Sequence, residues 1–351
     1  MIYSVDVHDM LELHNLEDGK FIKNIELPSL GSVSISCQKH IDEFFFNFSS
    51  FLYPGTIFRY SSQTHSCQIF KDTQVPDFDK SKFLTQQVFY PSKDGTSIPM
   101  YIISRKDLQC NGNNPFFIYG YGGFSIGLPP EFNTFRLCLI ENLKVSVAIP
   151  NIRGGDEYGD FWHESAKKEK KQNCFDDFQC AAEYLIKNNY TNPKKIAING
   201  GSNGGLLVGA CINQRPDLYG CAVATQGLYD MLRYHLFTIG YAWKVEYGDP
   251  ENPEDAKYLI KYSPVHNVRT KTPYPAVLIK TSEFDDRVVP VHAYKFISEL
   301  QEKAGEESEA PLLLAVQRKC GHGAGKPTSK KIDEAADIYT FIAISLGLNY
   351  D

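Results

Sequence analysis

The residue types needed for nucleophilic catalysis occur together at residues 199–208, NGGSNGGLLV. Ser202 occupies the centre of a G-x-S-x-G pattern, after the apolar run Ile196–Ile198 and before the helical stretch Leu206–Ile212. A strand, a tight turn and a helix in this order raise one serine hydroxyl above the end of a sheet, and the glycines let backbone approach closely. The alternative is a glycine-rich structural turn, because the pattern also occurs by chance. We expect Ser202 to be a nucleophile.

A serine nucleophile needs a base, and His322 is the best candidate in the chain. It lies in CGHGAG, residues 320–325, after the last expected strand, Leu312–Val316. A histidine between glycines in a loop has no core to fill, which favours a chemical role. Its imidazole would take the Ser202 proton and return it to the leaving amine. Surface or core roles are expected for the histidines without this context, namely His163, His235, His266 and His292.

The acid that orients the base should follow a later strand, since the expected chain order is serine, acid, histidine. The apolar run Ala276–Lys280 leads into the loop 281–287, TSEFDDR. Asp285 and Asp286 are both candidates, and chemistry alone does not choose between them. The alternative is that both are ordinary loop carboxylates, one of them paired with Arg287.

Acyl transfer also needs donors for the developing oxyanion. The backbone N–H of Asn203, directly after the nucleophile, is one candidate. The other should come from an early loop, and the stretch 119–124, YGYGGF, follows the expected strand Phe116–Tyr119. The Tyr121 hydroxyl is a possible donor there. The alternative is a glycine-rich turn with two packed tyrosines.

These candidates lie on a regular alternation of strands and helices. Short apolar runs predict further strands at 145–149 and 221–225, and helical faces recur at 178–186 and 293–300. A closing helix begins near residue 332. Alternation over about 250 residues predicts an α/β fold with a mostly parallel, doubly wound sheet and helices on both faces.

Residues 1–75 differ from the rest, because they read as antiparallel strands only. A hairpin is expected around Asp18-Gly19, and more short strands follow at the spacing of propeller blades. There is strand for one to two blades, so this stretch cannot be a complete propeller. Either it packs against the following domain or the chain lacks its beginning. We predict a partial β-propeller at 1–75 and a catalytic domain at 76–351, joined by a polar linker near 76–83.

Composition limits the classes of partner. The 351 residues are 42% hydrophobic with a net charge of −6, which argues against nucleic acid and anionic membrane surfaces. No stretch reaches the ~18 apolar residues of a membrane span, and no signal peptide is visible. The nine cysteines form no C-x-x-C pair, which weakens a zinc interpretation and favours free thiols in the cytoplasm. We expect no metal and no cofactor.

Several long motifs resemble the prolyl oligopeptidase family of serine peptidases. They are FFIYGYGGF at 116–124, KQNCFDDFQCAAEYLI at 171–186, NGGSNGGLLV at 199–208, NQRPDLYG at 213–220, DDRVVP at 285–290 and GHGAGKPT at 321–328. The resemblance implies an α/β-hydrolase domain with a β-propeller and a triad of Ser202, Asp285 and His322. It thereby selects the first aspartate, and it assigns the second oxyanion donor to Tyr121.

The resemblance also implies a pocket for the proline ring of a substrate. Its residues correspond to Phe124, Trp243, Tyr247, Val288 and Leu228, with Arg287 matching an arginine that binds a substrate carbonyl. A flat indole suits a rigid pyrrolidine ring and needs no charge. Without the resemblance, Trp243 would be read as a core aromatic. Leu228 stands where the family leads us to expect valine, and Asp156 where it leads us to expect glycine.

The sequence therefore predicts a cytoplasmic, monomeric serine endopeptidase that cleaves short peptides after proline. One alternative is a catalytically impaired fragment with an interaction or regulatory role, because the family places most of its propeller before the equivalent of residue 1. A lone blade would leave strand edges unpaired. Another alternative is an esterase on the same fold, which would leave the proline-pocket match unexplained.

Overall fold

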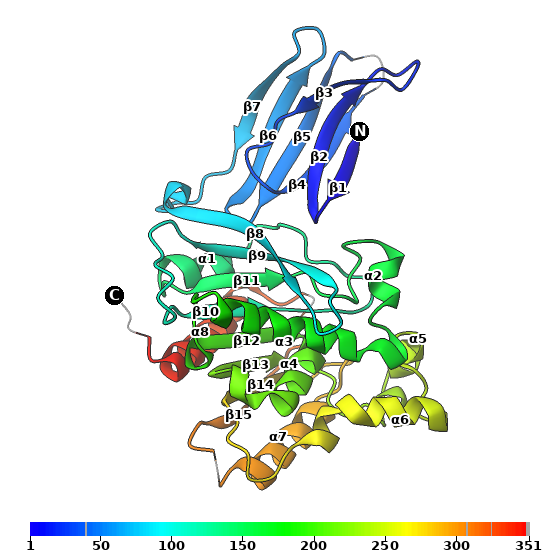
Figure 1. The fold of residues 1–351 in the computed structure, drawn as a ribbon, viewed down its shortest axis with the longest axis vertical. Helices are drawn as coiled ribbons and strands as arrows, with labels where there is room; N and C mark the ends of the chain where they lie inside the picture. Colours follow the sequence, from blue (N-terminus) through cyan, green and yellow to red (C-terminus); the bar gives the residue numbers. More distant parts are fainter. Residues whose placement is uncertain (39–40, 307, 324, 349–351) are drawn as a thin grey trace.

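Two antiparallel sheets at the amino terminus stand on a larger α/β body (Figure 1). The structure is a computed structural model that describes residues 1–38, 41–306, 308–323 and 325–348. Ala324 of the GHGAGKPT motif lies outside the described residues. The carboxyl-terminal helix packs on the central sheet of the α/β body.

The α/β body is organised around an eight-stranded sheet in the order β15-β14-β13-β12-β10-β11-β9-β8. The six strands from β15 to β11 run parallel, whereas β9 pairs antiparallel with β11, and β8 with β9. The predicted mostly parallel sheet is confirmed, and a hairpin formed by β8 and β9 is its antiparallel edge. The strands are β8 (Phe83–Pro91), β9 (Ser97–Arg105), β10 (Phe116–Tyr119), β11 (Ser146–Pro150), β12 (Ile196–Gly201), β13 (Cys221–Thr225), β14 (Ala276–Ser282) and β15 (Leu312–Gln317).

Helices cover both faces of this sheet, as expected (Figure 1). Side chains alternate along each strand, so Phe116 and Ile118 enter the core under α3, α4 and α7 while Phe117 enters the core under α1 and α8. The helices are α1 (Thr134–Glu141), α2 (Asp160–Glu164), α3 (Gln172–Lys187), α4 (Asn203–Gln214), α5 (Lys244–Tyr247), α6 (Pro253–Tyr262), α7 (Val291–Ala304) and α8 (Thr328–Leu346).

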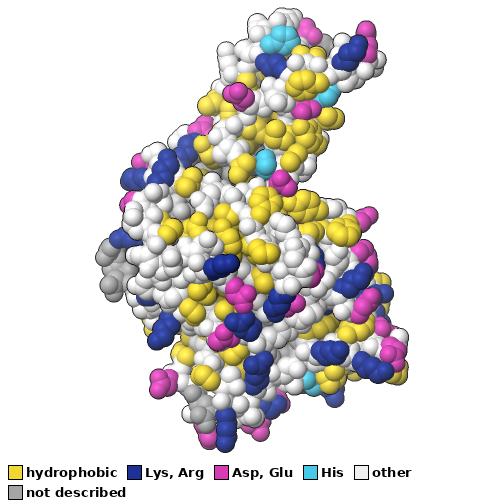
Figure 2. All heavy atoms as spheres, in the orientation of Figure 1, with side chains coloured by type: hydrophobic (Ala, Val, Ile, Leu, Met, Phe, Trp, Pro, Cys, Tyr) yellow, Lys and Arg dark blue, Asp and Glu magenta, His cyan; other side chains and the backbone are white. Residues whose placement is uncertain are grey.

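The amino-terminal segment forms a three-stranded and a four-stranded antiparallel sheet. The first holds β1 (Ile2–Val5), β2 (His8–His14) and β3 (Phe21–Ile25), and the second holds β4 (Ser32–Cys37), β5 (Glu43–Ser50), β6 (Tyr53–Ser61) and β7 (Ser66–Asp72). The strands expected here are present, and β1 is an additional one. Hydrophobic side chains are visible on the surface of these sheets (Figure 2), and Ile69 and Phe70 of β7 are both more than half exposed.

The turn between β1 and β2 attaches these sheets to the α/β body. Asp6 and Val7 both have positive φ, so the turn is tight. The Tyr101 hydroxyl donates to the Val7 carbonyl at 3.0 Å, and the Tyr158 hydroxyl donates to the Asp6 carboxylate at 2.8 Å. Val7 and Phe51 share a core with Tyr101. The amino-terminal segment therefore packs against the following domain, which was one of the two expectations.

Candidate active site

Ser202 lies in a strained turn between β12 and α4. Its φ of 57° and ψ of −117° lie in a region that residues with a Cβ rarely adopt. Its N–H donates to the Thr225 carbonyl on the neighbouring strand at 2.9 Å, which fixes the turn. A Cβ at Gly200 or Gly204 would overlap backbone atoms, so the turn requires glycine on both sides. This is the local structure in which a serine hydroxyl projects from the sheet edge.

Asp285 and His322 lie together after the last two strands. The His322 Nδ1 is 2.7 Å from one Asp285 carboxylate oxygen. The other oxygen accepts the N–H groups of Arg287 at 3.1 Å and Val288 at 2.8 Å. Asp285 is buried, whereas Asp286 is exposed. The carboxylate is therefore held by its own turn and can orient the imidazole, leaving Nε2 for a second partner.

The loops that carry Ser202 and His322 are both attached to the end of β13. Thr225 accepts from the Ser202 N–H, and the next residue, Gln226, donates through Nε2 to the Gly321 carbonyl at 3.0 Å. Gln226 also donates to the Ser282 hydroxyl at 2.9 Å. The two loops thus lie side by side rather than on opposite faces of the molecule. Sequence reasoning missed Gln226, which no local motif marks.

The candidate oxyanion donors are linked to the nucleophile turn by the Asn203 side chain. Its amide nitrogen donates to the Tyr121 carbonyl at 2.6 Å, and its amide oxygen accepts from the Tyr247 hydroxyl at 2.8 Å. Burial raises the pKa of the Tyr121 phenol, while a hydrogen bond with Ser202 acts in the opposite direction. The direction of this shift favours the protonated phenol, which is the form that can donate a hydrogen bond.

Aromatic rings gather beside this turn. Phe124 and Tyr247 meet edge to face at 5.5 Å between centroids, and Tyr247 meets Tyr234 in the same way. Trp243 is nearly parallel to Tyr234 at 6.4 Å. Of the predicted pocket residues, Leu228 and Val288 are buried in the same core, and Arg287 is exposed. Tyr234, which joins Trp243 to the other rings, was not predicted.

A buried carboxylate, Glu246, supports the loop that holds Tyr121 and Phe124. It accepts the Phe124 N–H at 3.0 Å and lies 2.7 Å from the His163 Nε2. Lys171, also buried, is 3.6 Å from Glu246 and donates to the Gly122 carbonyl at 2.8 Å. Phe124 has a positive φ of 58°, a conformation that needs such support.

Sequence reasoning missed Glu246 and Lys171. The available signal was a single acidic residue between the two aromatic residues Trp243 and Tyr247, in a short segment that the resemblance assigned to the pocket. A charge at such a position is buried only if it has partners.

Three further findings concern the described residues as a whole. None of their helices is both long and apolar enough to cross a bilayer. No group of three or more His, Cys, Asp and Glu side chains among them is arranged to hold a metal ion. All nine cysteines are free.

A mostly parallel eight-stranded sheet, a serine at a strained strand-to-helix turn and a histidine after the last strand define the α/β-hydrolase class. The sequence profile of the prolyl oligopeptidase family matches residues 130–349, and that of the prolyl oligopeptidase N-terminal β-propeller domain matches residues 1–73. The chain belongs to the prolyl oligopeptidase family.

Named relatives match almost all of the chain. A prolyl endopeptidase of Dictyostelium discoideum is 46% identical over 99% of this chain and 46% of its own length, and one of Elizabethkingia meningoseptica is 41% identical over 99% and 49%. The solved structure of prolyl oligopeptidase B from Galerina marginata, bound to a 35mer hydrolysis and macrocyclization substrate, has a TM-score of 0.93 and 42% identity over 100% of this chain and 50% of that one. The chain spans about half the length of the curated relatives it matches.

Proposed function

We propose that this chain is a serine-type endopeptidase that hydrolyses peptide bonds on the carboxyl side of proline in short peptides. The observation that carries the proposal is the hydrogen bond between His322 and the buried Asp285, on a loop tied beside the strained Ser202 turn. The relatives named prolyl endopeptidase support the same substrate class.

In the proposed mechanism, the Ser202 hydroxyl attacks the carbonyl carbon of the substrate's proline residue. His322 takes the hydroxyl proton and then gives it to the departing amine, while Asp285 remains ionised and stabilises the imidazolium. The Asn203 N–H and the Tyr121 hydroxyl stabilise the oxyanion. Water, deprotonated by His322, then hydrolyses the acyl-enzyme and releases the peptide acid.

We assign substrate selection to the aromatic group beside the turn. The partly buried Trp243 and Phe124 offer flat uncharged surfaces to a pyrrolidine ring, and the buried Tyr247, Leu228 and Val288 pack behind them. The exposed Arg287 would donate to a carbonyl of the bound peptide.

The proposal extends to the oligomeric state, the cellular compartment and the partners of the protein. We infer a monomer in the cytoplasm without nucleic-acid partners, supported by the free cysteines and the net charge of −6. We also propose the division into domains 1–75 and 76–351, which the match of the propeller profile to residues 1–73 supports.

The function is tested with an N-capped Gly-Pro p-nitroanilide and the purified chain. We expect release of p-nitroaniline that the Ser202→Ala variant lacks, because residual catalysis without the nucleophile is several orders of magnitude lower. An unchanged rate in Ser202→Ala, or no release by a folded protein, would contradict the proposal. A second arm uses p-nitrophenyl acetate, since serine-dependent hydrolysis of the ester without the prolyl amide identifies an esterase.

A further inference from the structure

A separate cavity of about 360 Å³ lies on the face of the sheet covered by α1 and α8. Its wall is formed by the ends of β10, β12 and β13, by both helices and by the loop that follows His322. None of the residues assigned to the proline pocket contributes to it. Its size lies in the usual range for small-molecule sites, which begins at about 300 Å³.

Arg136 on α1 carries a charge that no described carboxylate balances at close range. Its guanidinium stacks over the Tyr119 ring at 4.7 Å from the centroid. The guanidinium makes no hydrogen bond or ion pair with any residue of the described ranges, and only the backbone N–H of Arg136 donates, to the Asn133 side chain. Burial lowers the pKa of this guanidinium, although Tyr119 and the charge of Glu131 act in the opposite direction. A partly buried cation without an anion is costly, which points to an anionic occupant.

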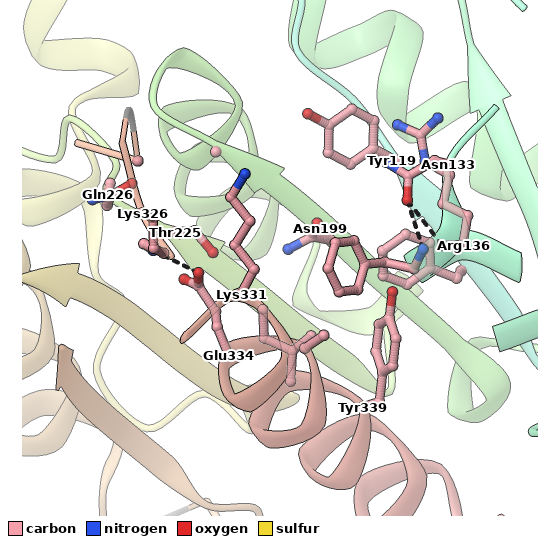
Figure 3. A pocket seen from close by; sticks show the side chains of 16 residues that line it. Tyr119, Asn133, Arg136, Asn199, Thr225, Gln226, Lys326, Lys331, Glu334 and Tyr339 are labelled. Carbon is pink, nitrogen blue, oxygen red and sulfur yellow. Dashed lines mark hydrogen bonds and ion pairs between the residues drawn. The ribbon is translucent and has the colours of Figure 1, made fainter. Parts of the chain in front are cut away.

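Three more donors line the same cavity without a protein acceptor. The Lys331 ammonium and the hydroxyls of Tyr119 and Tyr339 form no hydrogen bond with the described part of the chain. Lys331 and Tyr339 reach up from α8, while Arg136 and Tyr119 lie across the cavity from Lys331 (Figure 3). Ammonium and guanidinium groups only donate, so together they select an acceptor-rich partner.

The other charged residues of the cavity neutralise each other. The Lys326 ammonium is 2.6 Å from the Glu334 carboxylate, also seen as a dashed line in Figure 3. Arg136 and Lys331 therefore leave the cavity with an excess of positive charge. The rest of its wall is largely apolar, with Phe117, Phe135 and Ile338 among its residues.

We propose that this cavity binds a small organic anion that carries a carboxylate or phosphate group on an apolar body. Arg136 and Lys331 bind the oxyanion, since a guanidinium fork matches the geometry of both groups. Phe117, Phe135 and Ile338 contact the apolar body. The neutral amide of Asn199, on β12, lies between the two cations (Figure 3).

The position of the cavity connects it to the candidate triad. Gly201 and Gly323 both line it, and they are the chain neighbours of Ser202 and His322. This step rests on the proposed function: an occupant would alter hydrolysis without entering the proline pocket. The binding itself does not require the chain to be an enzyme, so the two proposals fail independently.

Isothermal titration calorimetry with four probes tests the binding. We expect phenylacetate or phenyl phosphate to bind at least tenfold more tightly than benzyl alcohol, which lacks the charge, and than inorganic phosphate, which lacks the apolar body. The tighter of the two organic anions identifies the preferred head group. Equal binding of benzyl alcohol, equal binding of inorganic phosphate, or no binding of either organic anion would overturn the proposal.

Variants locate the site. We expect Lys331→Ala and Arg136→Gln to weaken binding of the organic anion at least tenfold, and Tyr339→Phe to weaken it less. Lys257→Ala removes the same charge from the exposed face of α6 and serves as the matched control. Lys331 is exposed, so its variant is expected to fold even where Arg136→Gln does not. Unchanged affinity in Lys331→Ala would overturn the proposal.

Provided that the chain hydrolyses the prolyl amide, steady-state kinetics give a third test of the site. The bound anion is expected to change kcat in a non-competitive pattern. Purely competitive inhibition would place the anion in the substrate pocket and overturn the separate site.

Discussion

The two sides of the Ser202 turn differ in how completely their polar groups are paired. On the side of the aromatic rings, Asn203, Tyr247 and Glu246 each have a hydrogen-bond partner in the chain. On the side of α8, the guanidinium of Arg136 and the ammonium of Lys331 have no such partner among the described residues. The comparison suggests a difference in kind: the proposed catalytic groups are held by partners within the chain, whereas the cations of the cavity await the anion that we propose.

The largest expected effect on the paired side comes from Asp285→Asn. An amide cannot hold His322 in the tautomer that accepts the Ser202 proton, so kcat on the prolyl amide should fall by about 10⁴-fold. The control is Asp286→Asn, which changes an exposed neighbour and should alter kcat by less than about threefold. Equal losses in the two variants would contradict the assignment of the acid.

The carboxylate of Glu157 also has an unpaired oxygen atom, and we expect it to make the stability of the protein depend on pH. One of its oxygens is buried without a partner, and burial raises its pKa from 4.5 to about 7. The pKa of Glu157 is higher in the folded than in the unfolded chain. Its protonated carboxyl therefore contributes fully to stability below pH 4.5, and this contribution is lost as the pH rises through 7.

Glu157→Gln removes this loss. The free energy of unfolding of the variant minus that of the parent should therefore increase from pH 5 to pH 8, by up to about 3 kcal/mol. Urea unfolding at the two pH values measures the difference. A gap that is constant with pH, or that shrinks as pH rises, would show that Glu157 does not titrate as described.

Glu246 tests whether the support beneath the Tyr121 loop acts on catalysis. Glu246→Ala leaves the Phe124 N–H without its acceptor and removes the carboxylate that balances the Lys171 charge, and a displaced loop should lower kcat/KM by about 10²-fold. Glu246→Gln keeps an acceptor for Phe124 and should recover most of the loss. If both variants lose the same activity while both fold, the positioning role is wrong.

The smallest effect is expected from Tyr247→Phe. It keeps the ring against Phe124 but removes the hydroxyl that donates to the Asn203 side chain, so kcat should fall by about tenfold with little change in KM. A rise in KM at unchanged kcat would instead mean that Tyr247 acts only as a wall of the pocket.

The sequence predicted those parts of the fold and candidate site that are encoded locally. Glycine-flanked motifs at strand ends marked Ser202 and His322, and the apolar runs marked nearly every strand of the central sheet. The helices α1, α2, α5 and α6 and the strand β1 were not predicted: α1 has no strong periodic pattern, and α2, α5 and β1 are only four or five residues long. The amphipathic pattern of α6 was present in the sequence and was missed.

The supporting residues escaped for a different reason. Glu246 meets Phe124 from 122 positions away in sequence, and Gln226 meets Gly321 from 95. Such pairs can be predicted only when the order of the strands in the sheet is known, because no local spacing in the sequence indicates them. The unpaired donors around Arg136 were invisible for the same reason, because they come from α1, β10 and α8.

The central claim, that Ser202 is activated by His322, is tested most directly by a fluorophosphonate probe and intact-protein mass spectrometry. The account predicts a single adduct that peptide mapping places on Ser202, formed at least 10²-fold more slowly in His322→Ala. Absence of an adduct at Ser202 in the folded protein, or an equal rate in His322→Ala, would contradict it.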